Sequence, residues 1–171
     1  MTVGVDIQTV ANLKARVGKH VSVIFAKNGK IKAENGILGH LKPEGINLLI
    51  DGLLHDTIEF FTNGKRATLY IYDEHDFEVL SGSLHPPMSF LLRDKDQSKK
   101  IIARLKSNFK KELFVVFKQK GNFYVRSGKL FDLGIQGLKL QTTYYEFVIC
   151  NYNTIFNIFD TDLNDILKIN G

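Results

Sequence analysis

Apolar and polar residues alternate along two stretches of the chain, residues 19–51 and 111–142, in the pattern typical of β-strands. The second stretch is a weaker copy of the first. Its glycines align at a constant offset of 92 residues, Gly36 with Gly128 and Gly45 with Gly137. Further along, the pair Tyr72 and Leu80 aligns with Phe159 and Leu167 at an offset of 87 residues. A repeat of this kind predicts two units of one architecture.

Turn-forming residues divide each unit into short strands. The dipeptides Asn28-Gly29 and Asn63-Gly64 are strong signals for two-residue hairpins, and Lys120-Gly121 predicts a further turn. Gly36 lies inside a strand-like run, where a missing side chain favours a sharp bend. Five strands with one bend can close into a small barrel. The expected strands are residues 21–25, 30–35, 45–51, 57–62, 66–72 and 77–80, then 112–118, 122–132, 137–142, 143–150 and 154–159. Residues 162–169 could form a helical turn or the last strand, and the repeat favours the strand.

Each unit begins with an amphipathic stretch that predicts a helix. Residues 6–17 place apolar side chains along one stripe, with Asp6 as N-cap and Gly18 just after the last turn. Residues 98–109 repeat this pattern, with Ser98 as N-cap. We therefore predict a mainly β fold of two tandem five-stranded small barrels, each preceded by an α-helix.

The repeat also sets the domain boundaries. We expect the first unit at 1–81, a connecting segment at 82–97 and the second unit at 98–171. The connecting segment contains Pro86-Pro87, which is typical of a loop. Its apolar residues are too numerous for a solvated linker and are expected to pack between the two units: Met88, Phe90, Leu91 and Leu92.

The composition is typical of a globular protein, since 44% of the 171 residues are hydrophobic and 24% are charged. The single Cys150 cannot form an internal disulfide and is expected to be a buried thiol. No apolar run approaches the roughly 18 residues of a membrane span, and the chain does not begin with a signal-peptide pattern. We therefore expect a cytoplasmic protein that does not bind a membrane.

The formal charge of +5 is distributed unevenly. Residues 97–120 contain eight Lys or Arg side chains and one acid, Glu112. Residues 44–80 contain eight acids and only two basic residues, Lys65 and Arg66. The basic stretch has the charge expected of a polyanion-binding site, or it is the solvated face of a helix that has no partner.

Candidate catalytic chemistry is sparse. The five His residues have no metal-ligand spacing, and Cys150 has no second Cys as a partner. The chain contains no glycine-rich phosphate loop and no Ser nucleophile motif. The acidic turn 73–76 could hold a cation, but such a turn more often caps a bend through hydrogen bonds to the backbone. We expect no enzymatic activity, no bound metal and no cofactor.

The order of elements around Asn28-Gly29 resembles that of the Sm and Sm-like proteins, which include bacterial Hfq. The resemblance rests on a helix, an apolar strand, the Asn-Gly turn, a bent strand with Gly39-His40-Leu41 and a third strand near Asn47. The segments 70–80 and 157–167 occupy the position of the family's second motif. This resemblance implies Sm-like, SH3-like small barrels that join edge to edge into rings. It also implies that RNA bases bind at the loops around the pore.

A second resemblance concerns Asp132-Leu133-Gly134-Ile135-Gln136-Gly137. This stretch is similar to the Asp-x-Ser-x-x-Gly motif of PilZ domains, with Gly134 in place of Ser. It implies cyclic di-guanylate binding as a minor alternative.

The charge pattern and the Sm-like resemblance together predict a module that binds single-stranded RNA. Basic side chains contribute phosphate contacts, and aromatic faces stack unpaired bases. Because Phe123 and Tyr124 are neighbours in a strand, only one of them can point outward. The alternative is a protein-interaction or assembly module, and we expect a homo-oligomer formed through barrel edges. The candidate nucleic-acid-binding residues are Lys27, Asn28, Lys30, Lys32, Asn47, Lys99, Lys100, Lys106, Lys110, Lys118, Lys120, Tyr124 and Arg126.

Overall fold

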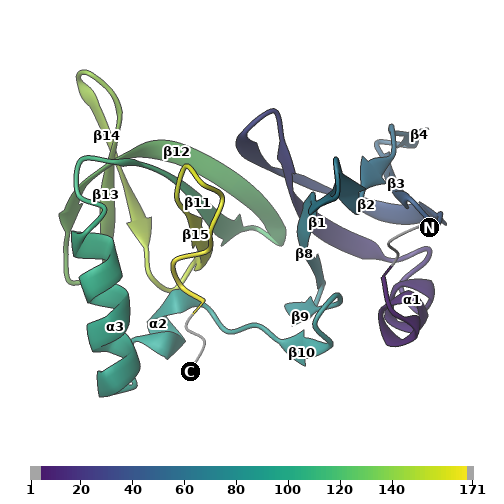
Figure 1. Cartoon of the computed structure of the whole chain (residues 1–171), viewed down its shortest axis with the longest axis horizontal. Helices are drawn as coiled ribbons and strands as arrows, with labels where there is room; N and C mark the ends of the chain where they lie inside the picture. The colour runs from purple at the N-terminus through teal and green to yellow at the C-terminus, as the bar shows by residue number, and fades with distance from the viewer. Residues whose placement is uncertain (1–4, 169–171) are drawn as a thin grey trace. The chain divides into compact units, whose positions relative to one another are not determined.

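The computed structural model describes residues 5–168 and shows, within that range, a mainly β chain with three helices (Figure 1). The chain divides into two compact units with a boundary between His85 and Pro86, except that residues 29–31 group with the second unit. We call them unit 1 and unit 2. None of the helices in the described range is long and apolar enough to span a membrane. The ends of the two expected units, residues 1–4 and 169–171, lie outside the described residues.

Unit 1 is built on one antiparallel sheet and begins with α1 (Ile7–Lys14). The strand order in the sheet is β10-β9-β8-β1-β2-β3-β4, and β5 also pairs with β3. A separate hairpin of β6 and β7 follows β5. The strands are β1 (His20–Lys27), β2 (Lys30–Leu41), β3 (Gly45–Ile50), β4 (Leu53–Leu54), β5 (Ile58–Glu59), β6 (Phe61–Thr62), β7 (Lys65–Arg66), β8 (Thr68–Asp73), β9 (Phe77–Glu78) and β10 (Ser83–Leu84).

Unit 2 begins with a short helix, α2 (Met88–Leu91), and a longer one, α3 (Lys95–Lys106). Its five-stranded sheet has the order β14-β13-β12-β11-β15. The last strand of the chain therefore pairs with the first strand of the unit, as β8 pairs with β1 in unit 1. The strands are β11 (Glu112–Gln119), β12 (Asn122–Leu133), β13 (Gly137–Thr143), β14 (Glu146–Asn151) and β15 (Ile155–Phe159).

The predicted two-residue turns connect β1 to β2 and β11 to β12. Asn28 and Gly29 have φ angles of 54° and 74°, and Lys120 and Gly121 have φ angles of 52° and 83°. Positive φ at both central residues is the geometry of the tight hairpin turn whose twist matches that of the strands. Asn63-Gly64 forms a similar turn, but it joins only the two-residue strands β6 and β7. The strand predicted before it, 57–62, is divided at Phe60 into β5 and β6.

Residues 92 positions apart also make equivalent backbone hydrogen bonds in the two units. Val17 bridges Leu38 in unit 1, and the equivalent Phe109 bridges Leu130 in unit 2. The register of β2 against β3 shifts after Leu38, and that of β12 against β13 shifts after Leu130. The bend predicted in the second strand is therefore a β-bulge at the same place in both units.

Two pairs of glycines are required by the close approach of neighbouring strands. A Cβ atom on Gly45 would lie 2.2 Å from the carbonyl oxygen of Ile58, and one on Gly137 would lie 2.2 Å from that of Cys150. At Gly36 and Gly128 the nearest carbonyl oxygens would be 2.6 and 2.8 Å away. No side chain fits at these distances, so the aligned glycines mark equivalent backbone contacts. The predicted equivalence of Gly36 and Gly128 is confirmed.

The change of offset from 92 to 87 has a structural cause. In unit 1 the six residues 61–66, which contain β6 and β7, separate Phe60 from Ala67. In unit 2 one residue separates the equivalent positions, Tyr152 and Thr154, which make matching backbone hydrogen bonds. Six residues against one account for the difference of five. Unit 1 therefore carries an inserted hairpin.

Each unit has its own hydrophobic core. In unit 1, Leu13 of α1 packs among buried side chains of β1, β2, β3 and β8. In unit 2, Ile101 and Leu105 of α3 pack against β11, β12 and β13. Met88 is buried in that same core, so the expected packing of the connecting segment between the units is wrong for this residue. Leu91 and Leu92 also pack against the core of unit 2, whereas Phe90 is exposed.

The predicted helix ends need correction. α1 ends at Lys14 instead of residue 17, although Asp6 is its N-cap as predicted. α3 begins at Lys95 instead of residue 98. The reason is that the carboxylate of Asp94 accepts two backbone N–H hydrogen bonds from the first turn, at 3.0 and 3.1 Å, and so caps the helix before Ser98.

The expected last strand at 162–169 is absent from the described residues up to 168. Only Asp165 bridges Phe159. The carboxylate of Asp160 accepts hydrogen bonds from the N–H groups of Asp162 and Asn164, both at 3.0 Å, and these bonds hold the chain in a turn. Among the described residues, no strand ladder joins the two ends of either sheet, so the structure does not show two closed barrels.

Candidate nucleic-acid interface

A groove in unit 2 lies between the end of β11, the start of β12 and the strand β14. It has a volume of about 410 Å³. Its cations are Lys118 and Arg126, and the residues that line it include no carboxylate. The groove therefore has the charge that an anionic ligand requires. The lining residues are Phe117, Lys118, Gln119, Arg126, Val148, Ile149, Cys150, Asn151 and Thr154.

The hairpin register brings an aromatic pair and a cation together at this groove. Phe117 pairs with Tyr124 across β11 and β12, and Val115 pairs with Arg126. Residues two apart on a strand share a face, so Tyr124 and Arg126 lie on the same side as Phe117. The rings of Phe117 and Tyr124 lie 5.8 Å apart, and the guanidinium carbon of Arg126 lies 5.7 Å from the Phe117 ring centroid. A stacking surface thus adjoins a positive charge.

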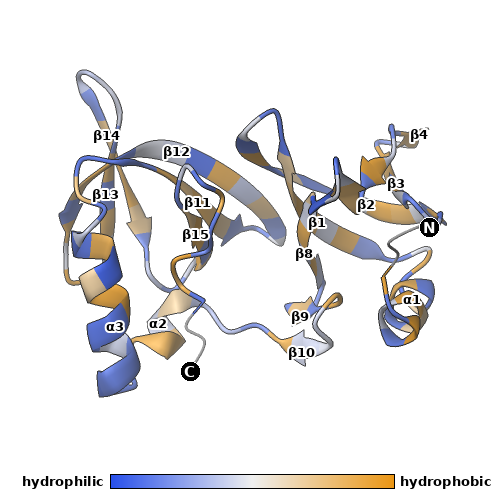
Figure 2. Ribbon diagram, viewed as in Figure 1, coloured by the Kyte–Doolittle hydropathy of each residue, from blue (hydrophilic) through white to orange (hydrophobic). Residues whose placement is uncertain are grey.

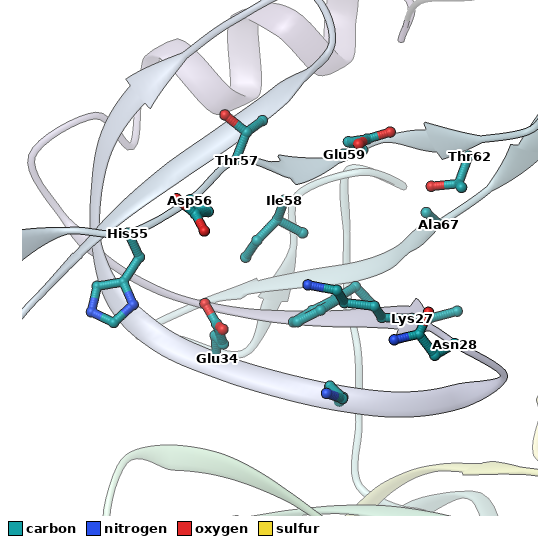
Figure 3. Close-up of a pocket in the computed structure, with 13 residues that line it drawn as sticks. Lys27, Asn28, Glu34, His55, Asp56, Thr57, Ile58, Glu59, Thr62 and Ala67 are labelled. Atoms are coloured by element: carbon teal, nitrogen blue, oxygen red, sulfur yellow. The ribbon is translucent and has the colours of Figure 1, made fainter.

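Unit 1 has a groove at the equivalent place, with a volume of about 400 Å³ (Figure 3). Its lining residues match those of the unit 2 groove at the repeat offsets, from Phe25 for Phe117 to Ala67 for Thr154. In Figure 3, Glu34 of β2 and Asp56 of the segment before β5 point toward one another across the groove. The groove is therefore a feature of the shared backbone.

The two grooves differ in charge. The unit 1 groove contains three carboxylates as well as Lys27 and Lys32. These carboxylates would repel phosphate groups, whereas the unit 2 groove has cations alone. At three equivalent positions only unit 1 has a carboxylate: Glu34 for Arg126, Asp56 for Val148 and Glu59 for Asn151. Ala26 also stands in place of Lys118, and Lys27 in place of Gln119.

The predicted site residues of unit 1 fall into two groups. Lys27, Asn28 and Lys32 line the groove, and Lys30 is exposed on the same hairpin. Asn47 is 4% exposed, and its amide donates hydrogen bonds of 3.0 Å to the carbonyl oxygen of His55 and to Oγ1 of Thr57. It therefore holds the break between β4 and β5, and it is buried, unlike the three lysines.

The predicted lysines around α3 form a separate exposed surface. Lys99, Lys100 and Lys106 are exposed on the helix, and Lys110 is exposed in the turn that follows. Figure 2 shows α3 as largely hydrophilic, with its hydrophobic residues on part of the surface. None of these lysines is among the residues that line the two grooves. The structure therefore separates the predicted site into a groove and a basic helix.

In the β11–β12 hairpin of unit 2 the structure brings together three of the four predicted residues. Lys118 and Arg126 line the groove, and Tyr124 contacts Phe117 beside it. Lys120 lies in the exposed turn and does not line the groove. The expectation that only one of the neighbouring aromatics points outward is confirmed, since Phe123 is 1% exposed and Tyr124 is 43% exposed.

Sequence reasoning missed Phe117 and the wall formed by β14. Phe117 could have been found, because a two-residue turn at Lys120-Gly121 places it opposite Tyr124. The β14 wall, which includes Val148 and Cys150, had no comparable signal. Its place depends on the pairing of β13 with β14 and on the bend of β12.

The acidic turn of unit 1 caps a bend, as predicted. Oδ1 of Asp73 accepts hydrogen bonds from the N–H groups of His75 and Phe77 at 2.8 and 3.1 Å. Its Oδ2 lies 3.2 Å from Nη2 of Arg16 on α1. In the range that the structure describes, no cluster of three or more His, Cys, Asp or Glu side chains is placed to hold a metal ion.

The titratable groups beside the unit 2 groove are less acidic than usual. Burial raises the pKa of the Cys150 thiol. Burial, and then the nearby charge of Asp132, raises the pKa of Tyr152. Burial therefore favours the neutral form of both groups.

The loop that resembles a PilZ motif is held by contacts within unit 2. The hydroxyl of Tyr152 donates to the carbonyl oxygen of Gly134 at 2.7 Å. Oδ1 of Asp132 accepts a hydrogen bond of 2.9 Å from the N–H of Leu133. Ile135 at the tip is 99% exposed.

Comparison of the chain with protein-family models, curated proteins and solved structures found no match.

Proposed function

We propose that the protein binds single-stranded RNA and that the groove of unit 2 is its binding site. The observation that carries this proposal is the pairing of Lys118 and Arg126 with the rings of Phe117 and Tyr124 in a groove that no carboxylate lines. Unpaired bases stack on exposed aromatic rings, and phosphates require nearby cations. A duplex hides the faces of its bases, so the site favours single strands.

The proposal extends to the family. We propose that each unit is a diverged Sm-like small barrel. The helix, the apolar first strand, the tight turn and the bulged second strand occur in this order in both units, which supports the resemblance. The burial of Asn47 means that RNA is not held at that position of unit 1.

The basic surface around α3 supplies a second set of phosphate contacts in this proposal. Its lysines are exposed, and no ion pair within 4.0 Å is found for them among the described residues. Phosphate binding at this surface would strengthen the complex for every sequence alike, because phosphate contacts carry no base information.

A salt series with a fluorescent single-stranded RNA tests this function. The parent chain should bind with an affinity that falls steeply as salt rises. Lys118→Gln with Arg126→Gln should reduce the slope of log affinity against log salt by about 1.4, for two lost phosphate contacts. The helix variant with Lys99, Lys100, Lys106 and Lys110 changed to Gln should reduce the slope by about 3 and leave stability nearly unchanged.

The control is Lys27→Gln with Lys32→Gln, which removes the two lysines that line the unit 1 groove. This control should bind RNA as the parent does. A parent chain that does not bind at about 50 mM salt would contradict the function. An unchanged slope for the unit 2 groove variant would remove the groove as the site.

A second candidate function, assembly of copies of the chain, is favoured by the edges of the unit 1 sheet. The edge strand β4 carries Leu53 and Leu54, which are 69% and 48% exposed, and β10 at the other edge carries Leu84, which is 72% exposed. Unpaired edge strands with apolar side chains pair readily with another chain. In this proposal unit 1 joins copies of the chain through its edge strands, and unit 2 binds RNA.

A further inference from the structure

An aromatic cluster outside the groove lies across β12, β13 and β14 of unit 2. Phe131 and Phe147 are 54% and 41% exposed, and their ring centroids are 4.8 Å apart at an angle of 66°. Lys139 stands on the strand between them. Its Nζ lies 5.5 Å from the Phe131 centroid and 5.0 Å from the Phe147 centroid. Two exposed rings therefore share one cation.

The strand register explains why these side chains meet on the surface. Phe131 lies at the register shift of β12, and a bulge re-aims the side chain that it carries. Lys139 pairs with Ile149 of β14, and Ile149 also lines the groove. The cluster and the groove are therefore joined across one strand.

The fold does not require this cluster. In unit 1 the equivalent positions carry Gly39 on β2, Asn47 on β3 and His55 in the break between β4 and β5. Gly39 has no side chain, and Asn47 is buried. Of the two units, the one with the cationic groove is also the one with the exposed rings.

We propose that Phe131, Lys139 and Phe147 form a second stacking site, which holds further bases of the RNA strand that occupies the unit 2 groove. This inference rests on the proposed function and extends it from one groove to a footprint of several nucleotides. Exposed aromatic side chains on neighbouring strands are a general platform for unpaired bases. The ammonium group of Lys139 supplies a phosphate contact beside them.

Charge at the cluster is compatible with this ligand. Asp132 lies opposite Lys139 in the register, and its Oδ1 accepts the N–H of Leu133, so part of this carboxylate is engaged by its own backbone. An RNA strand that passed from the groove over Ile149 to the two rings would start at Arg126 and reach Lys139 at the cluster. A cation therefore lies at each end of this route.

The test is an oligonucleotide length series with Phe131→Leu and Phe147→Leu combined. The parent should bind an oligouridylate of about 12 nucleotides at least about 10-fold more tightly than one of about 4 nucleotides, because added bases stack on the cluster. The double variant should lose this gain and bind the short oligonucleotide as the parent does. Phe90→Leu is the control, since Phe90 is also exposed in unit 2 and has Arg93 5.6 Å from its ring.

A second variant keeps the test decisive if the double variant folds poorly. The chain contains no Trp, so Phe147→Trp introduces a single Trp at the cluster, whose emission can be excited selectively over that of the six Tyr residues. The long oligonucleotide should quench its emission, and the short one should not.

Each contrary result has its own meaning. If the length gain persists in the double variant, or if Trp emission is unchanged by the long oligonucleotide, the second site is overturned while the groove remains. If the parent binds neither oligonucleotide, the proposed function itself fails. If the double variant changes only the sedimentation of the free protein, the cluster serves contacts between copies and the inference is overturned.

Discussion

Unit 1 and unit 2 have the same backbone plan and different surfaces. Both place a bulge after the same residue of the second strand, and both have a groove of about 400 Å³ at the same place. The unit 1 groove contains Glu34, Asp56 and Glu59, whereas Arg126 replaces the first of these in unit 2 and no acid remains. The comparison teaches that the backbone determines where the groove lies and a few side chains determine what it can bind.

The backbone plan and the groove side chains can differ independently because the former depends on buried positions and the latter are exposed. The glycines and core residues lie in close contact with neighbouring strands, where any added atom costs free energy. Groove side chains project into solvent, where substitutions usually change stability by less than about 0.5 kcal/mol. Charge in the groove can therefore differ between the units without altering the fold.

The largest expected effect is a loss of stability on substitution of the equivalent glycines that both units share. Gly45→Ala and Gly137→Ala should each lower the free energy of unfolding of the unit that carries them by about 3 kcal/mol or more, because the new Cβ meets a backbone oxygen that cannot move aside. Hydrogen-exchange mass spectrometry during urea unfolding reports each unit separately. Gly134→Ala is the control, because its Cβ would lie 3.2 Å from the carbonyl oxygen of Gly137, a full 1.0 Å farther than the 2.2 Å approach at Gly45 and Gly137. Alanine variants as stable as the parent would contradict the equivalence of the two glycines.

The next largest effect is a change in RNA affinity when charged residues are exchanged between the two grooves. Arg126→Glu gives unit 2 the unit 1 residue and should weaken RNA binding about 10- to 100-fold at low salt, because a charged phosphate contact is replaced by repulsion. Fluorescence anisotropy measures the loss. The reciprocal variant, with Glu34→Arg, Asp56→Val and Glu59→Asn in unit 1, should create a second RNA site.

Titration of that reciprocal variant with short RNA should give two sites per chain instead of one. Glu34→Gln alone is its control and should leave the stoichiometry unchanged, since Asp56 and Glu59 remain. A reciprocal variant with a single site would show that more than groove charge separates the two units.

The smallest effect concerns the edges of unit 1. Leu53→Lys with Leu54→Lys should reduce self-association at tens of micromolar protein, because charged side chains on an edge strand oppose pairing with another chain. Sedimentation should then give the mass of one chain, 19.4 kDa. Ile7→Lys is the control, since Ile7 is 90% exposed on α1 and away from any edge strand. A parent chain that already sediments at 19.4 kDa would exclude assembly through these strands.

Part of the candidate site could be predicted because it depends on contacts near in the sequence. The turn at Lys120-Gly121 determines that Phe117 faces Tyr124, and alternation along β12 then places Arg126 on the same face. The acidic turn after β8 could be predicted for the same reason, since Asp73 binds N–H groups only two and four residues away. Helix starts are less certain, because two capping residues can compete, as Asp94 and Ser98 do.

The sequence by itself determined the repeat, the hairpin turns and the positions of the required glycines. Each of these depends on a residue and its near neighbours, and the offset of 92 reveals which residues are equivalent. Only the tertiary structure decided that β14 forms the far wall of the groove, that Asn47 is buried and that the bulge turns Phe131 outward. These outcomes depend on the pairing and bending of strands far apart in the chain, where many weak contacts act together and no single residue carries the signal.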